Sequence, residues 1–421
     1  MNKVAVRYGP SPTGIPHVGN IRTALFNYLF AKNQNGKFYL RIEDTDQARI
    51  VNGAIEKIQE SLKLLNLNWD GEIIYQSKRL DIYEKHLKIL KEKGLAYEDE
   101  GAWRFKINVR KEKVIWQDAV HGEVSFPTNV LEDFVIVKSD GFPTYHFASV
   151  VDDHSMVISH VMRGDEWISS TPKHIQLYEA FGWEHPNFVH LPPILGANHK
   201  KLSKREGAKS VIEYIEEGYL SEALINFLAF LGWAPKSNKE IFSLEDLVNE
   251  FSLDRINKNS PVFNLEKLNW TNGQWIRKIS NEELTKKIHE KYPRYSVNAI
   301  SEFVPLTKDR LQTLIDFDKL AGPYLEDKIK VDPSKVILPV DKLQGFVNQY
   351  RKIDNWSKDK ISSATILEME SQKLTKVEAL GSIGTSISGS NVTPPIFDTL
   401  EKLGKSRTIQ RLENVIRNKK T

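Results

Sequence analysis

Apolar positions in the first hundred residues follow two different spacings. Residues 3–8 and 37–42 are short apolar runs with β-branched or aromatic side chains, which indicates strands. Between and after them, apolar residues recur at intervals of three and four within 17–35, 48–65 and 78–93, which predicts helices. A strand, a helix and a second strand in this order favour a parallel sheet of the doubly wound, Rossmann type.

The pattern changes near residue 97. Three apolar runs predict short strands, at 104–107, 123–126 and 134–137. We interpret residues 97–138 as a compact α+β insertion between two halves of one α/β domain. Two more strands and a helix are expected beyond it, at 144–151, 156–162 and 171–181.

From residue 212 to residue 419 the spacing is that of helices almost throughout. A Ser- and Gly-rich stretch, 381–390, predicts a turn region, with a flexible linker as the alternative. A chain of 421 residues is too long for one hydrophobic core. We therefore predict an α/β half followed by an all-α half, in five segments: 1–96, 97–138, 139–211, 212–278 and 279–421.

Composition then excludes several kinds of chemistry. The chain has no cysteine, which excludes a disulfide scaffold, a thiol nucleophile and Cys-ligated zinc. The net charge of +4 fits an anionic partner or simply a Lys-rich surface. The longest nearly apolar stretch, 223–234, is shorter than the roughly 20 residues that span a bilayer. No targeting segment is visible, so we expect a cytoplasmic protein.

The turn after the first strand, residues 10–20, reads PSPTGIPHVGN. Its prolines and glycines favour a rigid turn, and His17 and Gly19 then fall at the start of the first helix. Free N–H groups and the helix dipole favour phosphate there. Gly19 would let a nucleotide approach the backbone, and the His17 imidazole could donate to a phosphoryl oxygen. A histidine that merely caps the helix is the simpler alternative.

A basic segment, KKLSKR, occupies residues 200–205. A Lys-rich loop beside a nucleotide can neutralise triphosphate charge in a transition state. A solvated basic loop is the simpler alternative.

A third motif, RIEDTD at residues 41–46, ends the second strand. Carboxylates at this edge of a parallel sheet face the ligand crevice, where they can bind an ammonium group or a ribose. Thr45 or Asp46 could instead cap the following helix.

The order of these motifs resembles that of the class I aminoacyl-tRNA synthetases, whose two signatures end in HIGH and KMSKS. Within that class, the chain is similar to the bacterial-type glutamyl-tRNA synthetases. Further matching segments extend the resemblance over the whole chain: DGFPTYH at 140–146, VVDDH at 150–154, GYLSEAL at 218–224, FNLEKLNW at 263–270 and LGKSR at 403–407.

The resemblance implies a monomeric enzyme of translation with ATP, Mg²⁺, L-glutamate and tRNA(Glu) as cofactors and partners, and with neither a membrane nor an obligate protein partner. Glutamate and ATP would give glutamyl-adenylate, and the glutamyl group would pass to the 3′-terminal adenosine. Positioning and charge stabilisation suffice for in-line attack on phosphorus, so no covalent nucleophile is needed. Residues 97–138 would bind the acceptor end, 212–278 the stem and 279–421 the anticodon.

The resemblance also implies roles for single residues. Catalytic roles fall to His17, Lys201 and Lys204, and ATP contacts to His17, Gly19, Asn20, Glu166, Ile194 and Lys204. Glutamate contacts fall to Arg7, Gly9, Ser11, Glu43, Tyr145, Ser149 and Arg163. A guanidinium fits a planar carboxylate and rejects the neutral amide of glutamine. A structural ion pair is the alternative for Arg7 and Arg163.

In the helical half, the candidates for tRNA contacts are Arg310, Lys405, Arg407 and Arg411. Arg310 matches a position linked to reading the third anticodon base, which implies a discriminating enzyme. A helix-surface arginine, and with it an enzyme that also charges tRNA(Gln), is the alternative.

Some positions depart from the family pattern. The insertion is short and lacks cysteine, so we expect no structural zinc and a slimmer acceptor contact. Ser149 stands where some members have asparagine, and His121 stands where arginine is usual.

Four other functions are weaker candidates. A glutamyl-queuosine synthetase would lack the long half after Lys278, and glutaminyl-tRNA synthetases carry β-barrel anticodon domains. Small-molecule nucleotidylyltransferases would not need the helical half. An inactive RNA-binding paralogue would be expected to have lost signature residues.

Overall fold

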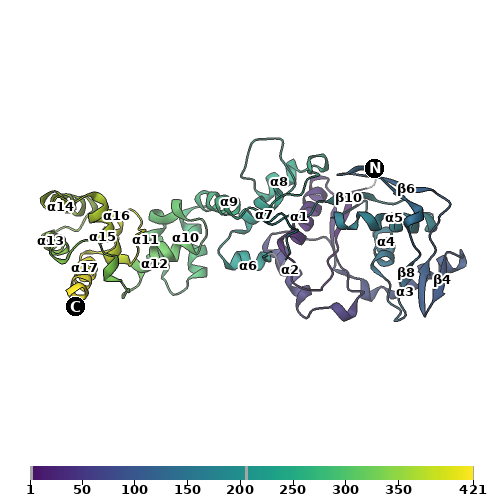
Figure 1. The fold of residues 1–421 in the computed structure, drawn as a ribbon, viewed down its shortest axis with the longest axis horizontal. Helices are drawn as coiled ribbons and strands as arrows, with labels where there is room; N and C mark the ends of the chain where they lie inside the picture. Colours follow the sequence, from purple (N-terminus) through teal and green to yellow (C-terminus); the bar gives the residue numbers. More distant parts are fainter. Residues whose placement is uncertain (1–2, 204–206, 421) are drawn as a thin grey trace. The chain divides into compact units, whose positions relative to one another are not determined.

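The computed structural model describes residues 3–203 and 207–420 (Figure 1). The chain divides into two compact units. Unit 1 comprises Met1–Glu216 and Ser221–Thr271, and unit 2 comprises Glu217–Leu220 and Asn272–Thr421. All the strands named below belong to unit 1, so the predicted succession of an α/β half and an all-α half is confirmed. The finer division into five segments stays a prediction.

The centre of unit 1 is a set of parallel strands. β1 (Ala5–Tyr8), β2 (Lys37–Ile42) and β3 (Ile74–Tyr75) pair in parallel, as do β9 (His160–Gly164) and β10 (Asn187–Leu191). The backbone N–H of Ser159, just before β9, donates to the carbonyl of Ala5 in β1 at 2.9 Å. The order is therefore β3-β2-β1-β9-β10, which runs outward in both directions from β1 and β9. Such a doubly wound sheet binds ligands at the carboxyl ends of its strands, where the order reverses.

Helices cover this sheet and extend beyond it: α1 (Val18–Asn33), α2 (Ala54–Leu64), α3 (Leu80–Glu92), α4 (Tyr145–Ser155), α5 (Thr171–Phe181), α6 (Val211–Glu216), α7 (Ser221–Ala229), α8 (Leu244–Glu250) and α9 (Leu265–Lys278). α1 contacts β1, β2, β9, α7 and α8. It is therefore buried on several sides, and Ile21, Leu25, Phe26 and Leu29 are all fully buried. This position holds the N-terminus of α1 firmly at the carboxyl edge of the sheet.

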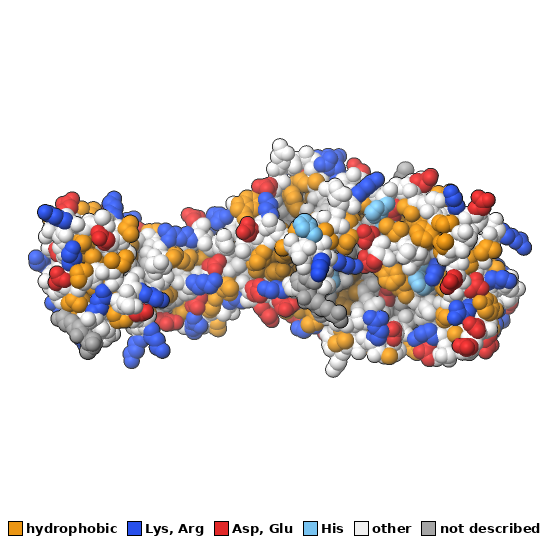
Figure 2. Space-filling view, in the orientation of Figure 1, with side chains coloured by type: hydrophobic (Ala, Val, Ile, Leu, Met, Phe, Trp, Pro, Cys, Tyr) orange, Lys and Arg blue, Asp and Glu red, His pale blue; other side chains and the backbone are white. Residues whose placement is uncertain are grey.

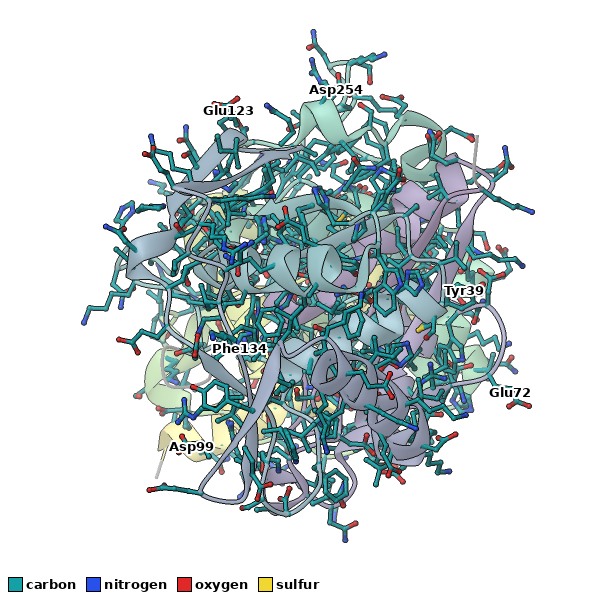
Figure 3. All side chains as sticks on the ribbon, turned by 90° about the vertical axis from the view of Figure 1, so that its right-hand side faces the viewer. Tyr39, Glu72, Asp99, Glu123, Phe134 and Asp254 are labelled. Carbon is teal, nitrogen blue, oxygen red and sulfur yellow. The ribbon has the colours of Figure 1, made fainter. Side chains whose placement is uncertain are left out.

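The insertion consists of five strands: β4 (Ala96–Asp99), β5 (Ala102–Phe105), β6 (Lys113–Asp118), β7 (Gly122–Pro127) and β8 (Phe134–Val137). β4, β5 and β8 form one antiparallel sheet, and the β6–β7 hairpin joins the edge of β10 through Asp118 and Phe188. Asp99, Glu123 and Phe134 mark β4, β7 and β8 in Figure 3.

The insertion at 97–138 was expected to contain both helix and strand, and the expected helical part is wrong. This described segment holds strands and one 3₁₀ turn, Thr128–Val130. In β6, buried and exposed residues alternate, which is the period of a strand and not of a helix. The helices that flank the insertion are α3 and α4.

The strand predicted at 144–151 is wrong, because these residues begin α4. Phe147, Ala148, Val150 and Val151 are all buried. A short apolar run buried on every side has the same pattern in a helix and in a strand, so periodicity alone could not separate them.

Unit 2 continues from α9 as helices only, among the described residues: α10 (Asn281–Lys291), α11 (Val297–Thr307), α12 (Asp316–Leu325), α13 (Val340–Arg351), α14 (Lys358–Ser371), α15 (Lys376–Ser388), α16 (Ile396–Leu403) and α17 (Lys405–Lys420). The turn predicted at 381–390 is wrong for most of its length, since α15 runs through it to Ser388. The small residues allow close packing: a Cβ on Gly384 would lie 3.0 Å from Thr393 Cγ2. Gly389 ends the helix with a φ of +75°.

Charged side chains of both signs are interspersed over the visible face (Figure 2). Within the described part of the chain, no helix has both the length and the apolar character needed to cross a membrane.

Candidate active site at the carboxyl ends of the parallel strands

A cavity of about 840 Å³ lies in unit 1. The carboxyl ends of β1, β2, β9 and β10 contribute to its wall. Its volume is within the range of roughly 300–1,000 Å³ that is typical of ligand sites. Twelve of the predicted site residues line it: Arg7, Gly9, Ser11, His17, Gly19, Asn20, Glu43, Tyr145, Arg163, Glu166, Ile194 and Lys201. The fold thus brings together residues that are up to 194 positions apart in sequence.

His17 is the N-cap of α1. Its Nδ1 accepts a hydrogen bond from the backbone N–H of Gly19 at 3.0 Å, and the Asn20 side chain accepts from the His17 backbone N–H at 3.2 Å. A neutral imidazole that accepts at Nδ1 carries its proton on Nε2. The capping role and a role as a phosphate donor are therefore compatible, because they use different ring nitrogens.

The two signature segments meet at this helix start. The backbone N–H of Val18 donates to the carbonyl of Lys209 at 3.1 Å, just after the KLSKR segment. The backbone N–H of Leu202 donates to the carbonyl of Ile194 at 2.8 Å, and Lys201 Nζ lies 3.5 Å from Glu166 Oε2 at the cavity wall. Lys204 lies outside the described residues.

Arg7 belongs to a buried network of four charges. Its Nε and Nη2 donate to the two carboxylate oxygens of Asp153, at 2.8 and 3.2 Å. Arg41 links Asp153 to Glu43: its Nη1 donates to Asp153 Oδ1 at 2.6 Å, and its Nη2 donates to Glu43 Oε1 at 2.9 Å. Burial disfavours the Asp153 charge, but Arg41 and Arg7 outweigh it and hold the pKa of Asp153 below its usual value. The ion pair considered as the alternative for Arg7 is therefore present.

Glu43 closes this network against the backbone. Burial raises the pKa of Glu43 despite the nearby guanidinium groups of Arg41 and Arg7. A Cβ on Gly9 would lie 2.5 Å from Glu43 Oε1, so a larger residue at that position would force the carboxylate to move. Gly9 therefore contributes by letting the carboxylate lie directly against the strand end.

Arg163 has a different environment from Arg7. It is 6% exposed, at the end of β9, and its guanidinium donates to four uncharged groups. These partners are His190 Nε2 at 3.2 Å, Tyr145 Oη at 3.0 Å, His174 Nδ1 at 3.3 Å and Thr171 Oγ1 at 2.9 Å. Among the described residues, no carboxylate lies within 4 Å of this guanidinium. A buried cation without a counterion is costly, so a bound anion would stabilise this guanidinium.

Ser149 is placed differently from the other predicted contacts. It lies one turn after Tyr145 in α4, is fully buried, and is not among the residues that line the cavity. Its Oγ has no hydrogen-bond partner among the described residues. A direct role in binding glutamate is therefore not supported by its position.

Sequence reasoning missed the residues that hold the predicted ones. Arg41 and Asp153 stand within the RIEDTD and VVDDH motifs, which predict no role for them, and no motif points to His190 or Asp118. The two adjacent aspartates of VVDDH are the feature of the sequence that could have indicated such a network. The sequence does not show which of them belongs to it: Asp153 binds Arg7 and Arg41, whereas Asp152 binds Arg79 and Tyr83.

The four tRNA candidates in unit 2 have unlike environments. Arg411 is 4% exposed, and its Nη1 and Nη2 donate to backbone carbonyls of Pro323, Ile387 and Glu326. Lys405 donates to the carbonyls of Arg351 and Ile353 at the end of α13. Cations at these positions stabilise helix ends.

Arg310 and Arg407 are closer to solvent. Arg310 contacts the carbonyl of Thr393, and Arg407 contacts the carbonyl of Glu326. Residues 3–203 and 207–420 contain no group of three or more His, Asp or Glu side chains suited to a metal ion.

A doubly wound parallel sheet, with a His-x-Gly helix start facing a Lys-Leu-Ser segment across one cavity, defines a class I synthetase of the Rossmann type. Comparison with known families agrees. Residues 3–102 and 98–270 match "tRNA synthetases class I (E and Q), catalytic domain", and residues 264–416 match "Anticodon binding domain". The chain belongs to the class I tRNA synthetases of the E and Q family.

Relatives that match over nearly the full length of both chains are named glutamate–tRNA ligases. A glutamate–tRNA ligase of Dehalococcoides mccartyi is 39% identical, with 99% of this chain and 98% of the relative covered. One of Finegoldia magna is 36% identical, with 99% and 100% covered. The crystal structure of a glutamate tRNA ligase from Elizabethkingia meningosepticum, in complex with its amino acid, is 32% identical and has a TM-score of 0.87 over 99% of both chains.

Proposed function

We propose that this protein is a glutamate–tRNA ligase, which activates L-glutamate with ATP and transfers it to the 3′-terminal adenosine of tRNA(Glu). The full-length similarity to glutamate–tRNA ligases supports the reaction. The observation that carries the choice of amino acid is Arg163, a buried guanidinium with uncharged partners at the end of the switch-point strand.

The charges around the carboxyl ends of β1, β2 and β9 fit glutamate. Arg7 and Arg41 are balanced by Asp153 and Glu43, so Arg163 adds one unbalanced positive charge. Glutamate, with two carboxylates and one ammonium, carries one net negative charge. The side-chain carboxylate of the substrate neutralises Arg163, assisted by the Tyr145 hydroxyl, and the side-chain amide of glutamine would leave the guanidinium without a counterion.

Glu43 is the proposed partner of the substrate ammonium. Both hydrogen bonds from Arg41 fall on Oε1, which leaves Oε2 to accept from the ammonium group. Arg7, Gly9 and Ser11 form the remaining wall on this side, and Arg7 acts by holding Asp153 as well as by its charge.

The opposite part of the cavity is proposed to hold ATP. His17 donates from Nε2 to a phosphate oxygen, while Gly19 and Asn20 lie at the helix N-terminus, where phosphate is favoured. Ile194 and Glu166 contact the nucleoside side. Lys201 and Lys204 stabilise the leaving pyrophosphate. Mg²⁺ commonly binds through substrate phosphates with one or two carboxylates, so we expect it to enter with ATP.

The reaction then needs no covalent enzyme intermediate. An oxygen of the α-carboxylate of glutamate attacks the α-phosphorus in line, the bond from phosphorus to the bridging oxygen breaks, and pyrophosphate leaves. A ribose hydroxyl of the terminal adenosine next attacks the activated carbonyl, and AMP leaves. The enzyme contributes orientation and positive charge in both steps.

Unit 2 is proposed to bind the anticodon, and the insertion is proposed to contact the acceptor end. Arg310 and Arg407 are the candidates for direct RNA contacts, whereas Lys405 and Arg411 support helix ends. With Arg310 present, we propose a discriminating, cytoplasmic, monomeric enzyme without zinc that charges tRNA(Glu) alone. A non-discriminating enzyme that also charges tRNA(Gln) is the alternative.

Glutamate-dependent ATP–pyrophosphate exchange, with and without tRNA, tests the reaction, and charging of purified tRNA(Glu) and tRNA(Gln) tests discrimination. We expect exchange that requires tRNA and charging of tRNA(Glu) alone. Arg163→Lys should lower kcat/KM for glutamate by about 100-fold, because an ammonium group cannot make the bidentate pair that a guanidinium forms with a carboxylate. Absence of exchange with every tRNA would refute the proposal, and charging of both tRNAs would refute discrimination only.

A further inference from the structure

The side chain of Arg163 is held from behind by a buried chain of two residues. Its Nε donates to His190 Nε2 at 3.2 Å, and His190 Nδ1 lies 2.6 Å from Asp118 Oδ2. His190 is fully buried on β10, and Asp118 is 4% exposed at the end of β6. Asp118 of β6, His190 of β10 and Arg163 of β9 therefore form a hydrogen-bonded chain that ends at the cavity.

The directions of these hydrogen bonds fix the tautomer of His190. Arg163 has only donors, so Nε2 of the imidazole must accept, and the proton must lie on Nδ1. Asp118 is the acceptor for that proton. Burial lowers the pKa of His190, which keeps the ring neutral at neutral pH. Without the Asp118 carboxylate, the opposite tautomer would place an N–H against an N–H of Arg163.

Asp118 is in turn fixed by the turn of the insertion. Its Oδ1 accepts from the backbone N–H of Val120 at 2.9 Å and of His121 at 3.0 Å. These bonds close the β6–β7 hairpin, whose outer margin is marked by Glu123 in Figure 3. Asp118 thus links the β6–β7 turn of the insertion to His190, which contacts the cavity arginine.

We propose that Asp118 is a positioning residue for Arg163, acting through the Nδ1–H tautomer of His190. This inference rests on the proposed function, because it assigns Arg163 to the substrate carboxylate. Asp118 itself does not line the cavity, so it acts only through the orientation of the guanidinium. The insertion thereby contributes to recognition of the amino acid.

The kinetic test is a double-mutant cycle in the full-length protein. Asp118→Asn keeps the size of the side chain but can present a donor to Nδ1. His190→Gln keeps an acceptor for Arg163 that has no tautomer. We expect D118N to raise KM for glutamate about tenfold with little change in KM for ATP, which follows the wrong-tautomer logic known for buried Asp–His pairs. D118N combined with H190Q should match H190Q alone.

Asp70→Asn is the matched control. Asp70 is an ion-paired carboxylate of the same unit that binds the backbone near the opposite end of β2, and it should change neither KM. Equal effects of D118N on both KM values, or additive effects in the double mutant, would overturn the positioning role. If the wild-type protein lacks exchange activity, the proposed function fails instead.

A second measurement does not depend on activity. With ¹⁵N-labelled histidine in the wild-type protein, the resonances of His190 are assigned by their loss in H190Q. The proposal requires the shift of a protonated Nδ1 and an unprotonated Nε2. A His190 protonated at Nε2 would overturn it.

Discussion

Arg41 Nη1 lies 2.6 Å from Asp153 Oδ1, although 112 positions separate the two residues in sequence. The same oxygen accepts from Arg7 Nε at 2.8 Å. One buried carboxylate therefore joins β1, β2 and α4 at the edge of the cavity. Removing it would leave two guanidinium groups buried beside a single remaining carboxylate, that of Glu43.

Asp153→Asn should consequently destabilise unit 1 by about 3 kcal/mol, the cost usual for breaking a buried ion pair from one side. Urea unfolding monitored by circular dichroism measures this change. The control is Asp70→Asn, which should cost less because Asp70 is partly exposed. An unfolding midpoint equal to that of the wild type would contradict the central role of Asp153.

Two substitutions at His17 separate its capping role from its proposed role toward phosphate. Asparagine is a good N-cap but is too short to carry a donor to the position of Nε2. We expect His17→Asn to keep stability near that of the wild type and to lower kcat of pyrophosphate exchange by about 100-fold, the scale of one lost charge-stabilising donor.

His17→Ala should add a loss of about 1 kcal/mol in stability, because the cap at the start of α1 is then absent. Thermal unfolding and exchange kinetics of both variants check this. Full activity in His17→Asn would show that the imidazole acts only as a helix cap and not as a phosphate donor.

Acid stability should depend on Asp70. Partial burial opposes its ionisation, but hydrogen bonds from Lys32, the backbone of Phe38 and Lys37 outweigh this and lower the pKa of Asp70 to about 2. A folded-state pKa below the unfolded value contributes stability at higher pH, which is lost as pH falls from about 4 towards 2.

The contribution is about 1 kcal/mol after allowance for solvent screening. Asp70→Asn should be less stable by that amount at pH 7 and should show a weaker fall in stability between pH 4 and pH 2. Urea midpoints across this range provide the measurement. Parallel curves for variant and wild type would show that Asp70 does not govern this slope.

Two arginines of unit 2 should behave differently despite the same charge. Arg411→Met leaves the carbonyls of Pro323, Ile387 and Glu326 without their donors, so we expect a loss of about 2 kcal/mol in stability. Arg310→Gln should leave thermal stability nearly unchanged and raise charging of tRNA(Gln) relative to tRNA(Glu). Charging assays with both tRNAs, beside thermal unfolding, distinguish the two. A stability loss of similar size in both variants would refute the distinction.

The sequence determined the parts with strong local signals. The strand over 37–42 agrees with β2, and the helix over 171–181 agrees with α5. In both segments the local spacing of apolar residues and the flanking residues point to the same element. The Pro- and Gly-rich turn before His17 and the basic segment near residue 201 marked two walls of the same cavity. Twelve of the residues predicted for the site line this cavity, since motifs carry chemistry in a few adjacent positions.

Only the tertiary structure decided which charges are balanced. Arg7 and Arg163 look alike in sequence, yet Arg7 is paired with Asp153 and Arg163 is surrounded by uncharged groups. Ser149 and Arg411 carry polar groups typical of binding sites, but the structure buries both side chains. Packing between distant segments sets burial and ion pairing, and a single sequence does not record which distant segments meet. For the same reason, the apolar run at 144–151 was resolved as a helix only by its surroundings.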